Sequence, residues 1–214
     1  MTTNMKSTIT ADKRPYRQGA RAQAAEQTAQ RIIEAFSKRL SQDWYDQITL
    51  ETIAREAQVT VPTIIRRFGG KDGLLEATWG RMAERLQTGR AADVGNVTGA
   101  VRVIVAEYEV AGDLVMRALA QEERYPVFKP VNDMGRKDHR AWIEATFAPW
   151  LDGLAAPERL RRVDGLVAAL DLYIWRLVRR DMGRPREHVE AVMLDLVRGV
   201  LGDDFLHPTH GGQR

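Results

Sequence analysis

Apolar side chains recur at intervals of three and four residues along most of the chain, from about residue 22 to residue 201. This interval is the repeat of one buried face of an α-helix, and no segment alternates strictly as a half-buried strand would. One break in the pattern is expected at Gly112. The pattern predicts an all-α protein of about nine helices, at residues 22–40, 50–57, 61–68, 71–88, 98–110, 113–123, 127–151, 157–181 and 184–201.

The second and third predicted helices have the dimensions of a helix-turn-helix, because each has about two turns and about three residues join them. Thr49 and Thr60 are suitable N-caps for the two helices. Pro62 fits a first helical turn, where a missing N–H group costs little. Gly69 and Gly70 tolerate the left-handed conformation that ends many helices.

The third predicted helix has two different faces. At about 100° per residue, one arc holds apolar side chains and the opposite arc holds polar ones. An exposed helix of this kind fits the DNA major groove, where Arg binds guanine and Thr touches a thymine methyl. A surface helix whose charges only confer solubility is the alternative. The apolar arc comprises Val61, Ile64, Ile65 and Phe68, and the polar arc Pro62, Thr63, Arg66 and Arg67.

This region resembles the DNA-binding domain of TetR-family transcriptional regulators over residues 20–75, with matching apolar, Thr, Phe and Lys positions in residues 31–36 and 48–75. Three positions depart from the family pattern, since Gln58 replaces a usual Gly, Ile65 a phosphate-contacting Tyr, and Arg67 a His or Tyr. The resemblance implies a dimeric regulator that binds double-stranded operator DNA. We expect the DNA contacts at Thr49, Thr60, Val61, Pro62, Thr63, Ile65, Arg66, Arg67 and Lys71, with the two cap hydroxyls and Lys71 on phosphates.

The charge distribution agrees with a polyanionic partner at the amino-terminal end. Residues 1–90 hold 15 Lys and Arg against 10 Asp and Glu, whereas residues 91–214 hold 17 against 19. A basic face without a partner is the alternative explanation. We expect a flexible basic arm at 1–20, the helix-turn-helix domain at 21–70, a helical ligand-binding and dimerisation domain at 71–204, and a flexible tail at 205–214.

Two of the carboxy-terminal helices carry apolar seams with a period near 3.5, which suits packing between helices. Packing within one chain is the alternative for either seam alone. Leu166, Leu172 and Tyr173 add more apolar surface than one partner helix covers, so we expect a two-fold dimer built as a four-helix bundle. The seam residues are Leu160, Val163, Val167, Leu170, Ile174, Leu177, Val189, Met193, Leu196 and Val200.

The middle helices concentrate aromatic and Met side chains, which suits a pocket for a small and mostly apolar effector. Glu109, Asp113, His139 or Asp171 could supply a polar group, and residues 71–88 could carry the signal to the DNA-binding helices. Ordinary core packing or exposure is the alternative for each residue. The candidate ligand-binding residues are Tyr108, Met116, His139, Trp142 and Tyr173.

Several other classes of protein find no support in the sequence. It contains no phosphate-binding glycine loop, His-Glu-x-x-His or Gly-x-Ser-x-Gly motif, so we expect no enzyme, catalytic residue or cofactor. Without Cys, and with His207 and His210 as an isolated pair, a metal site is not expected. No apolar run approaches the length of a membrane helix, and a cytoplasmic protein is expected. A nucleoid-type protein or a helical protein-interaction module without ligand sensing is the alternative function.

Overall fold

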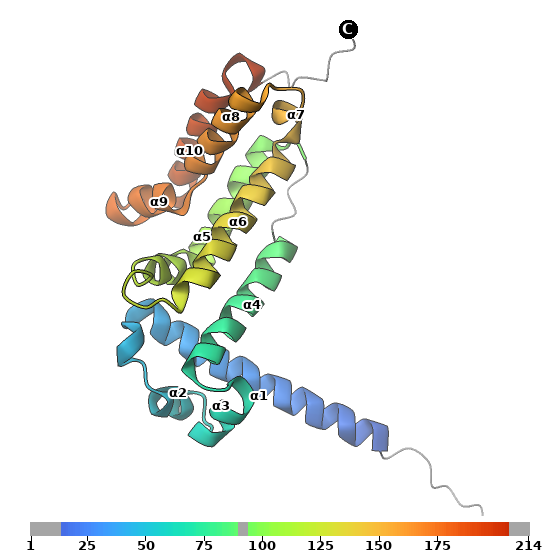
Figure 1. Cartoon of the computed structure of the whole chain (residues 1–214), viewed down its shortest axis with the longest axis vertical. Helices are drawn as coiled ribbons and strands as arrows, with labels where there is room; N and C mark the ends of the chain where they lie inside the picture. Colours follow the sequence, from blue (N-terminus) through green and yellow to red (C-terminus); the bar gives the residue numbers. More distant parts are fainter. Residues whose placement is uncertain (1–13, 90–93, 206–214) are drawn as a thin grey trace, which may run out of the picture.

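The computed structural model describes residues 14–89 and 94–205, and the first 13 residues, residues 90–93 and the tail from 206 onward lie outside the described residues (Figure 1). The described residues contain helices and turns and no strand, which confirms the all-α prediction. None of their helices is both long and apolar enough to span a bilayer. The elements are α1 (Arg14–Gln42), η1 (Tyr45–Gln47), α2 (Leu50–Glu56), α3 (Val61–Phe68), α4 (Lys71–Gly89), α5 (Val97–Leu119), α6 (Phe128–Thr146), α7 (Ala148–Leu151), α8 (Ala156–Ala169), α9 (Leu172–Trp175), η2 (Arg176–Asp181), α10 (Arg186–Leu201) and η3 (Gly202–Phe205).

The amino-terminal core is built by α1, α2, α3 and the first half of α4, at the lower end of Figure 1. It extends past the predicted domain boundary at residue 70, because Leu74, Leu75 and Trp79 of α4 are buried in it. Ala118 of α5 and Phe128 of α6 are buried in the same cluster. The helix-turn-helix region therefore shares its core with the helices above it.

The second core lies among α5, α6, α8, α9 and α10. In Figure 1, α10 runs back along the η2 and α8 segments, as the short connector after residue 181 predicts. Trp175 is fully buried at the centre of this core, and its Nε1–H donates to Glu109 of α5 at 2.8 Å. The apolar faces of these helices thus mainly cover one another within a single chain.

Three predicted helix limits near the chain ends and at Gly112 are corrected by the structure. α1 begins at Arg14, so the predicted flexible arm cannot reach residue 20, and η3 includes Phe205, which was assigned to the tail. α5 passes through Gly112 without a break. A Cβ built on Gly112 would lie 2.5 Å from Cζ3 of Trp175, so this glycine makes room for an aromatic ring rather than ending a helix.

Two long predicted helices are each divided in the structure. The helix expected at 127–151 ends at Thr146 and restarts as the short α7, with Phe147 between them outside the helical conformation. The helix expected at 157–181 ends at Ala169, and Asp171 caps α9 by accepting the N–H of Tyr173 at 2.8 Å. Beyond α9 the backbone becomes π-helical through η2. The spacing of apolar residues alone does not reveal these breaks in the two helices.

Replacing Gly112 by Ala should lower the free energy of unfolding by about 2 kcal/mol, because the new methyl group overpacks against the buried Trp175 ring. Gly80→Ala in α4 is the matched control, since nothing lies within 4 Å of its Cβ position and Ala favours a helix interior, for a gain of about 1 kcal/mol. Urea unfolding followed by circular dichroism measures both. Equal stability of the two variants would contradict the close contact.

Candidate nucleic-acid interface and ligand cavity

The helix-turn-helix begins with a capped helix, as the sequence predicts. The Thr49 hydroxyl accepts the backbone N–H of Thr52 at 3.2 Å at the start of α2. Thr60 precedes α3 in an extended conformation, but its hydroxyl lies 3.0 Å from the Thr63 hydroxyl and accepts no backbone N–H, so its predicted capping bond is wrong. Both Thr49 and Thr60 are exposed, and their predicted phosphate contacts remain predictions.

The turn between α2 and α3 closes with two backbone hydrogen bonds. The N–H of Val59 donates to Ala54 O at 2.9 Å, and the N–H of Gln58 donates to Arg55 O at 3.3 Å. This pairing is a Schellman motif, which requires a left-handed residue after the helix. Gln58 occupies that position with φ 55°, and it is the one non-glycine residue of the described chain with a positive φ. The departure from the family's glycine therefore leaves the turn geometry in place.

α3 places its side chains around a single buried residue, Ile64, which packs toward α2 and α4. Arg66 lies nearly opposite Ile64 on the helical wheel and is exposed. Ile65 was assigned to the apolar arc, but it is 48% exposed because it stands about 100° from Ile64, at the margin of the packed face. Pro62 is exposed beside these residues, whereas Val61 and Thr63 are half-buried. The outward face therefore combines a guanidinium, an exposed Ile and a proline.

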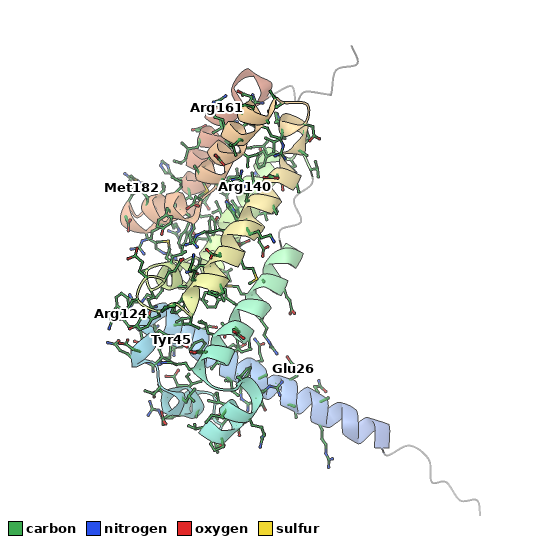
Figure 2. The ribbon with its side chains drawn as sticks, viewed as in Figure 1. Glu26, Tyr45, Arg124, Arg140, Arg161 and Met182 are labelled. Carbon is green, nitrogen blue, oxygen red and sulfur yellow. The ribbon has the colours of Figure 1, made fainter. Side chains whose placement is uncertain are left out.

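The two arginines of α3 differ in their surroundings. Arg67 donates to Glu26 of α1 at 3.3 Å, and Glu26 also pairs with Arg81 of α4. Figure 2 shows Glu26 on α1 where it passes α4. Arg66 has no hydrogen-bond or ion-pair partner among the described residues. Arg66 is consequently the cation of this helix that is free to bind a polyanion.

Lys71 has a structural role that the sequence did not predict. Its ammonium donates to the carbonyl oxygens of Tyr45 at 2.8 Å and Ile48 at 3.0 Å, and it lies 4.2 Å from the Tyr45 ring centroid. Burial lowers the pKa of this ammonium below its usual value. Lys71 thus supports the turn before α2 from within the protein, and its predicted phosphate contact stays a prediction.

Tyr45, in the turn between α1 and α2, is the centre of a junction with the upper helices (Figure 2). Its N–H donates to Oε1 of the fully buried Gln121, after α5, at 2.6 Å, and its hydroxyl donates to Asp72 of α4. Its ring meets Phe128 of α6 at 5.3 Å, and the Phe128 ring meets that of Trp79 at 6.4 Å. Burial and the hydrogen bond to Asp72 raise the pKa of the Tyr45 hydroxyl far above its usual value.

Arginines from the end of α5 hold the residues on both sides of Tyr45. Arg117 donates to Gln42 O at 3.2 Å, and its guanidinium lies 4.5 Å from the Trp44 ring centroid. Arg124 pairs with Asp46 at 3.1 Å. From the sequence, residues 41–47 are predicted only as a break between two helices. The adjacent aromatic residues Trp44 and Tyr45 in an otherwise polar break were the available signal.

A cavity of about 440 Å³ lies among α4, α5, α6 and the start of α9. Four of the five predicted ligand residues line it: Tyr108, His139, Trp142 and Tyr173. Met116 does not, because it packs against the carboxy-terminal core. The size and the mostly apolar wall, with four Trp and Tyr side chains, are those of a site for a small organic molecule.

The predicted polar groups divide between the cavity and the protein interior. Asp171 and His139 line the cavity. Glu109 instead accepts from Arg179 at 2.9 Å, and Asp113 accepts from Arg180 at 2.8 Å. These two acids fasten α5 to η2, so their assignment as ligand groups is corrected.

The predicted dimer seam is only partly available to a partner. Four of its residues are fully buried in the core of the single chain and cannot face a second copy, namely Val163, Leu170, Val189 and Met193. Leu160, Leu177 and Leu196 are 55%, 45% and 41% exposed, and Val167, Ile174 and Val200 are half-buried. Tyr173 of α9 is also exposed, and so is Met182, which Figure 2 labels beside the α9 and η2 segment. An apolar face therefore remains on α8, α9, η2 and α10.

Comparisons with known proteins agree with this geometry. Residues 32–78 match the sequence profile of bacterial regulatory proteins of the tetR family. A protein of Pseudomonas aeruginosa PAO1, described as a candidate transcriptional regulator, has a similar structure with a TM-score of 0.65 and 18% identity, over 86% of this chain and 95% of that chain. The multidrug binding protein EbrR, solved in complex with imidazole, gives a TM-score of 0.53 and 22% identity, over 78% of this chain and 88% of that chain. No curated protein sequence matches significantly.

The matched segment covers α2, α3 and the adjoining parts of α1 and α4, so it contains the helix-turn-helix described above. The two similar structures share the fold over 86% and 78% of this chain. Residues 32–78 are thus similar to the DNA-binding domains of TetR-family regulators, as the resemblance in the sequence implied.

Replacing Gln58 by Gly should raise the free energy of unfolding by about 1 kcal/mol, because a left-handed conformation strains any residue with a Cβ more than it strains Gly. Gln58→Ala keeps the Cβ and serves as the control, with a change below about 0.5 kcal/mol. Thermal and urea unfolding of the three proteins measure the difference. A Gly variant no more stable than the Ala variant would show that the turn is not strained.

Replacing Lys71 by Met should lower the free energy of unfolding by about 2 kcal/mol, because two carbonyl oxygens lose a charged donor and the Tyr45 ring loses a cation. Lys38→Met on the exposed side of α1 removes the same charge and should leave stability unchanged within about 0.5 kcal/mol. Urea unfolding distinguishes the two. Similar effects from both variants would return Lys71 to the role of a surface cation.

Proposed function

We propose that the protein is a ligand-released repressor that acts in the cytoplasm and binds a palindromic operator as a homodimer. The observation that carries this proposal is the exposed face of α3, with Arg66 free of partners, on a helix-turn-helix joined through Tyr45 to a helical domain that contains a cavity. DNA recognition, pairing of two copies and release by ligand are three separable parts of the proposal.

DNA recognition would use α3 in the major groove. Arg66 can donate two hydrogen bonds to O6 and N7 of a guanine, and the exposed Ile65 suits a thymine methyl group. The hydroxyls of Thr49 and Thr60 lie at the starts of α2 and α3, where they can donate to phosphates. Arg67 can join them after release from Glu26, an exposed ion pair that contributes little to stability.

Pairing of two copies would cover the apolar face that the single chain leaves exposed. Leu177 of η2 and Leu196 of α10 lie on this face, together with Tyr173 of α9. A two-fold axis through it brings α8 and α10 of both copies into a four-helix bundle. Two α3 helices then face one side of a duplex, which requires half-sites separated by about one helical turn or a multiple of it.

Release by ligand would act through α4, because this helix takes part in both sites. Trp79 and Met82 of α4 line the cavity, while Asp72 at its first turn binds Tyr45 beside α3. A ligand that favours one position of α4 shifts the dimer toward that arrangement, and equal affinity for both arrangements would shift nothing. The imidazole complex of the similar structure supports a ligand-binding role for this fold.

Selection of bound fragments from random duplex DNA tests recognition directly, and it should return a palindrome bound about 10³-fold more tightly than random DNA. Arg66→Ala should then cost about 1–3 kcal/mol of binding free energy and relax the preference at one base pair of each half-site. Arg102→Ala, on the exposed side of α5, removes the same charge far from α3 and should bind as the unaltered protein does. Nearly equal affinity for all sequences would instead indicate a nucleoid-type protein, and no affinity for DNA would indicate a protein-interaction module.

Replacing Leu177 by Glu should convert the dimer to a monomer, because an interface that buries this side chain would have to desolvate a carboxylate. Sedimentation equilibrium measures the mass, and operator binding should weaken at least tenfold. Val110→Glu is the control, since Val110 is 89% exposed on α5, outside the proposed face. An unchanged dimer in the Leu177 variant would place the interface elsewhere.

A further inference from the structure

The wall of the cavity carries more negative than positive charge. Its described residues include two carboxylates without an ion-pair partner in the described part of the chain, Asp138 and Asp171, and one guanidinium, Arg136. The charge of Arg136 is already balanced by two carboxylates that are not part of the cavity wall. Arg136 donates to Asp133 at 2.8 Å and also pairs with Glu122. The cavity therefore favours a cation and disfavours an anion, since a low-dielectric wall strengthens interactions between charges.

A second and independent feature of the same wall is an unused hydrogen-bond acceptor. Asn132 is 4% exposed, and its Nδ2 donates to Oε2 of Glu122 at 2.9 Å and to Ala118 O at 3.4 Å. These two acceptors fix the orientation of the amide, so that Oδ1 faces away from them. Oδ1 is buried and has no hydrogen-bond partner among the described residues. A buried acceptor of this kind is stabilised when a ligand brings an N–H or O–H donor to it.

The carboxylates of Asp138 and Asp171 differ in whether a hydrogen bond within the protein fixes their position. Asp171 is the N-cap of α9, and its Oδ1 accepts the N–H of Tyr173 at 2.8 Å. This bond fixes the carboxylate at the start of α9. Asp138 is half-buried and has no ion-pair partner in the described part of the chain. Both are placed to receive a donor from a ligand without losing a salt bridge within the protein.

From these features we propose that the effector is an organic amine, protonated at neutral pH and attached to an aromatic body. This assignment names the chemical class of the ligand. It rests on the proposed function only because it takes this cavity as the effector site. The aromatic body packs among the rings of Trp79, Tyr108 and Trp142, whose faces also attract a cation. The ammonium group donates to Asp138 or Asp171, and a further N–H reaches Asn132.

Three naphthalene derivatives of nearly the same shape test the class. 1-Naphthylmethylammonium carries the cation, 1-ethylnaphthalene replaces the ammonium by a methyl group, and 1-naphthylacetate carries an anion. Isothermal titration of the full-length protein without DNA should give the ammonium compound at least a tenfold higher affinity than the ethyl compound, and the acetate the weakest binding. Equal or tighter binding of the ethyl or acetate compound overturns the proposal, and so does the absence of measurable binding by the ammonium compound at millimolar concentration.

Asp138→Asn and Asp171→Asn should each weaken binding of the ammonium compound about tenfold and leave binding of the ethyl compound unchanged. Asn caps a helix as well as Asp does, so Asp171→Asn preserves the start of α9. Asp152→Asn, an exposed carboxylate outside the cavity wall, is the matched control and should change neither affinity. Circular dichroism melting confirms that each variant is folded. Equal losses for both compounds would assign the two acids a structural role and overturn the proposal.

The same titrations separate this proposal from the proposed function. Selective binding of the ammonium compound by a protein that selects no operator would leave the ligand class standing and remove the repressor. Operator binding without selectivity for the ammonium compound would leave the repressor standing and remove the proposed ligand class.

Discussion

The turn between α1 and α2 is held by side chains of α4, α5 and the α5–α6 connection, and the position of the helix-turn-helix depends on it. Lys71 of α4 donates to two of its carbonyl oxygens, Gln121 accepts the N–H of Tyr45, and Arg117 lies over the Trp44 ring. Unpaired polar groups in such a buried place would each cost about 1–3 kcal/mol. The turn can therefore move only when α4 and the α5–α6 connection move with it.

Because of this constraint, the amino-terminal helices and the helices of the second core form one mechanical unit. They are not two domains joined by a hinge. The amino-terminal core contains Phe128 of α6, and the Phe128 ring touches both Tyr45 and the cavity residue Trp79. A change in the cavity wall is therefore two ring contacts away from the turn that fixes α2 and α3. In contrast, the turn within the helix-turn-helix closes on its own backbone, so α2 and α3 move together.

The sequence predicts those features that are set by interactions within a few residues along the chain. The cap at Thr49, the proline of α3 and the left-handed Gly69 after Phe68 fix the limits of the helix-turn-helix, because each acts within a few residues. Gly112 was mistaken for a break because the ring that requires it, Trp175, lies 63 positions further along the chain. Four seam residues were assigned to a partner because a period of 3.5 identifies a buried stripe without saying which helix covers it. The structural role of Lys71 was missed because spacing cannot show that the Tyr45 carbonyl lies within its reach.

The five Trp residues are distributed over the cavity, the junction around Tyr45 and the carboxy-terminal core, and the chain has no Cys. Trp79 and Trp142 line the cavity, Trp44 lies under Arg117 at the junction, and Trp150 and Trp175 are buried in the carboxy-terminal core. Indole fluorescence therefore provides built-in probes of the cavity, the junction and the core. Because no native thiol competes, a fluorophore attached to one introduced Cys on α3 would report its movement against these indoles by energy transfer.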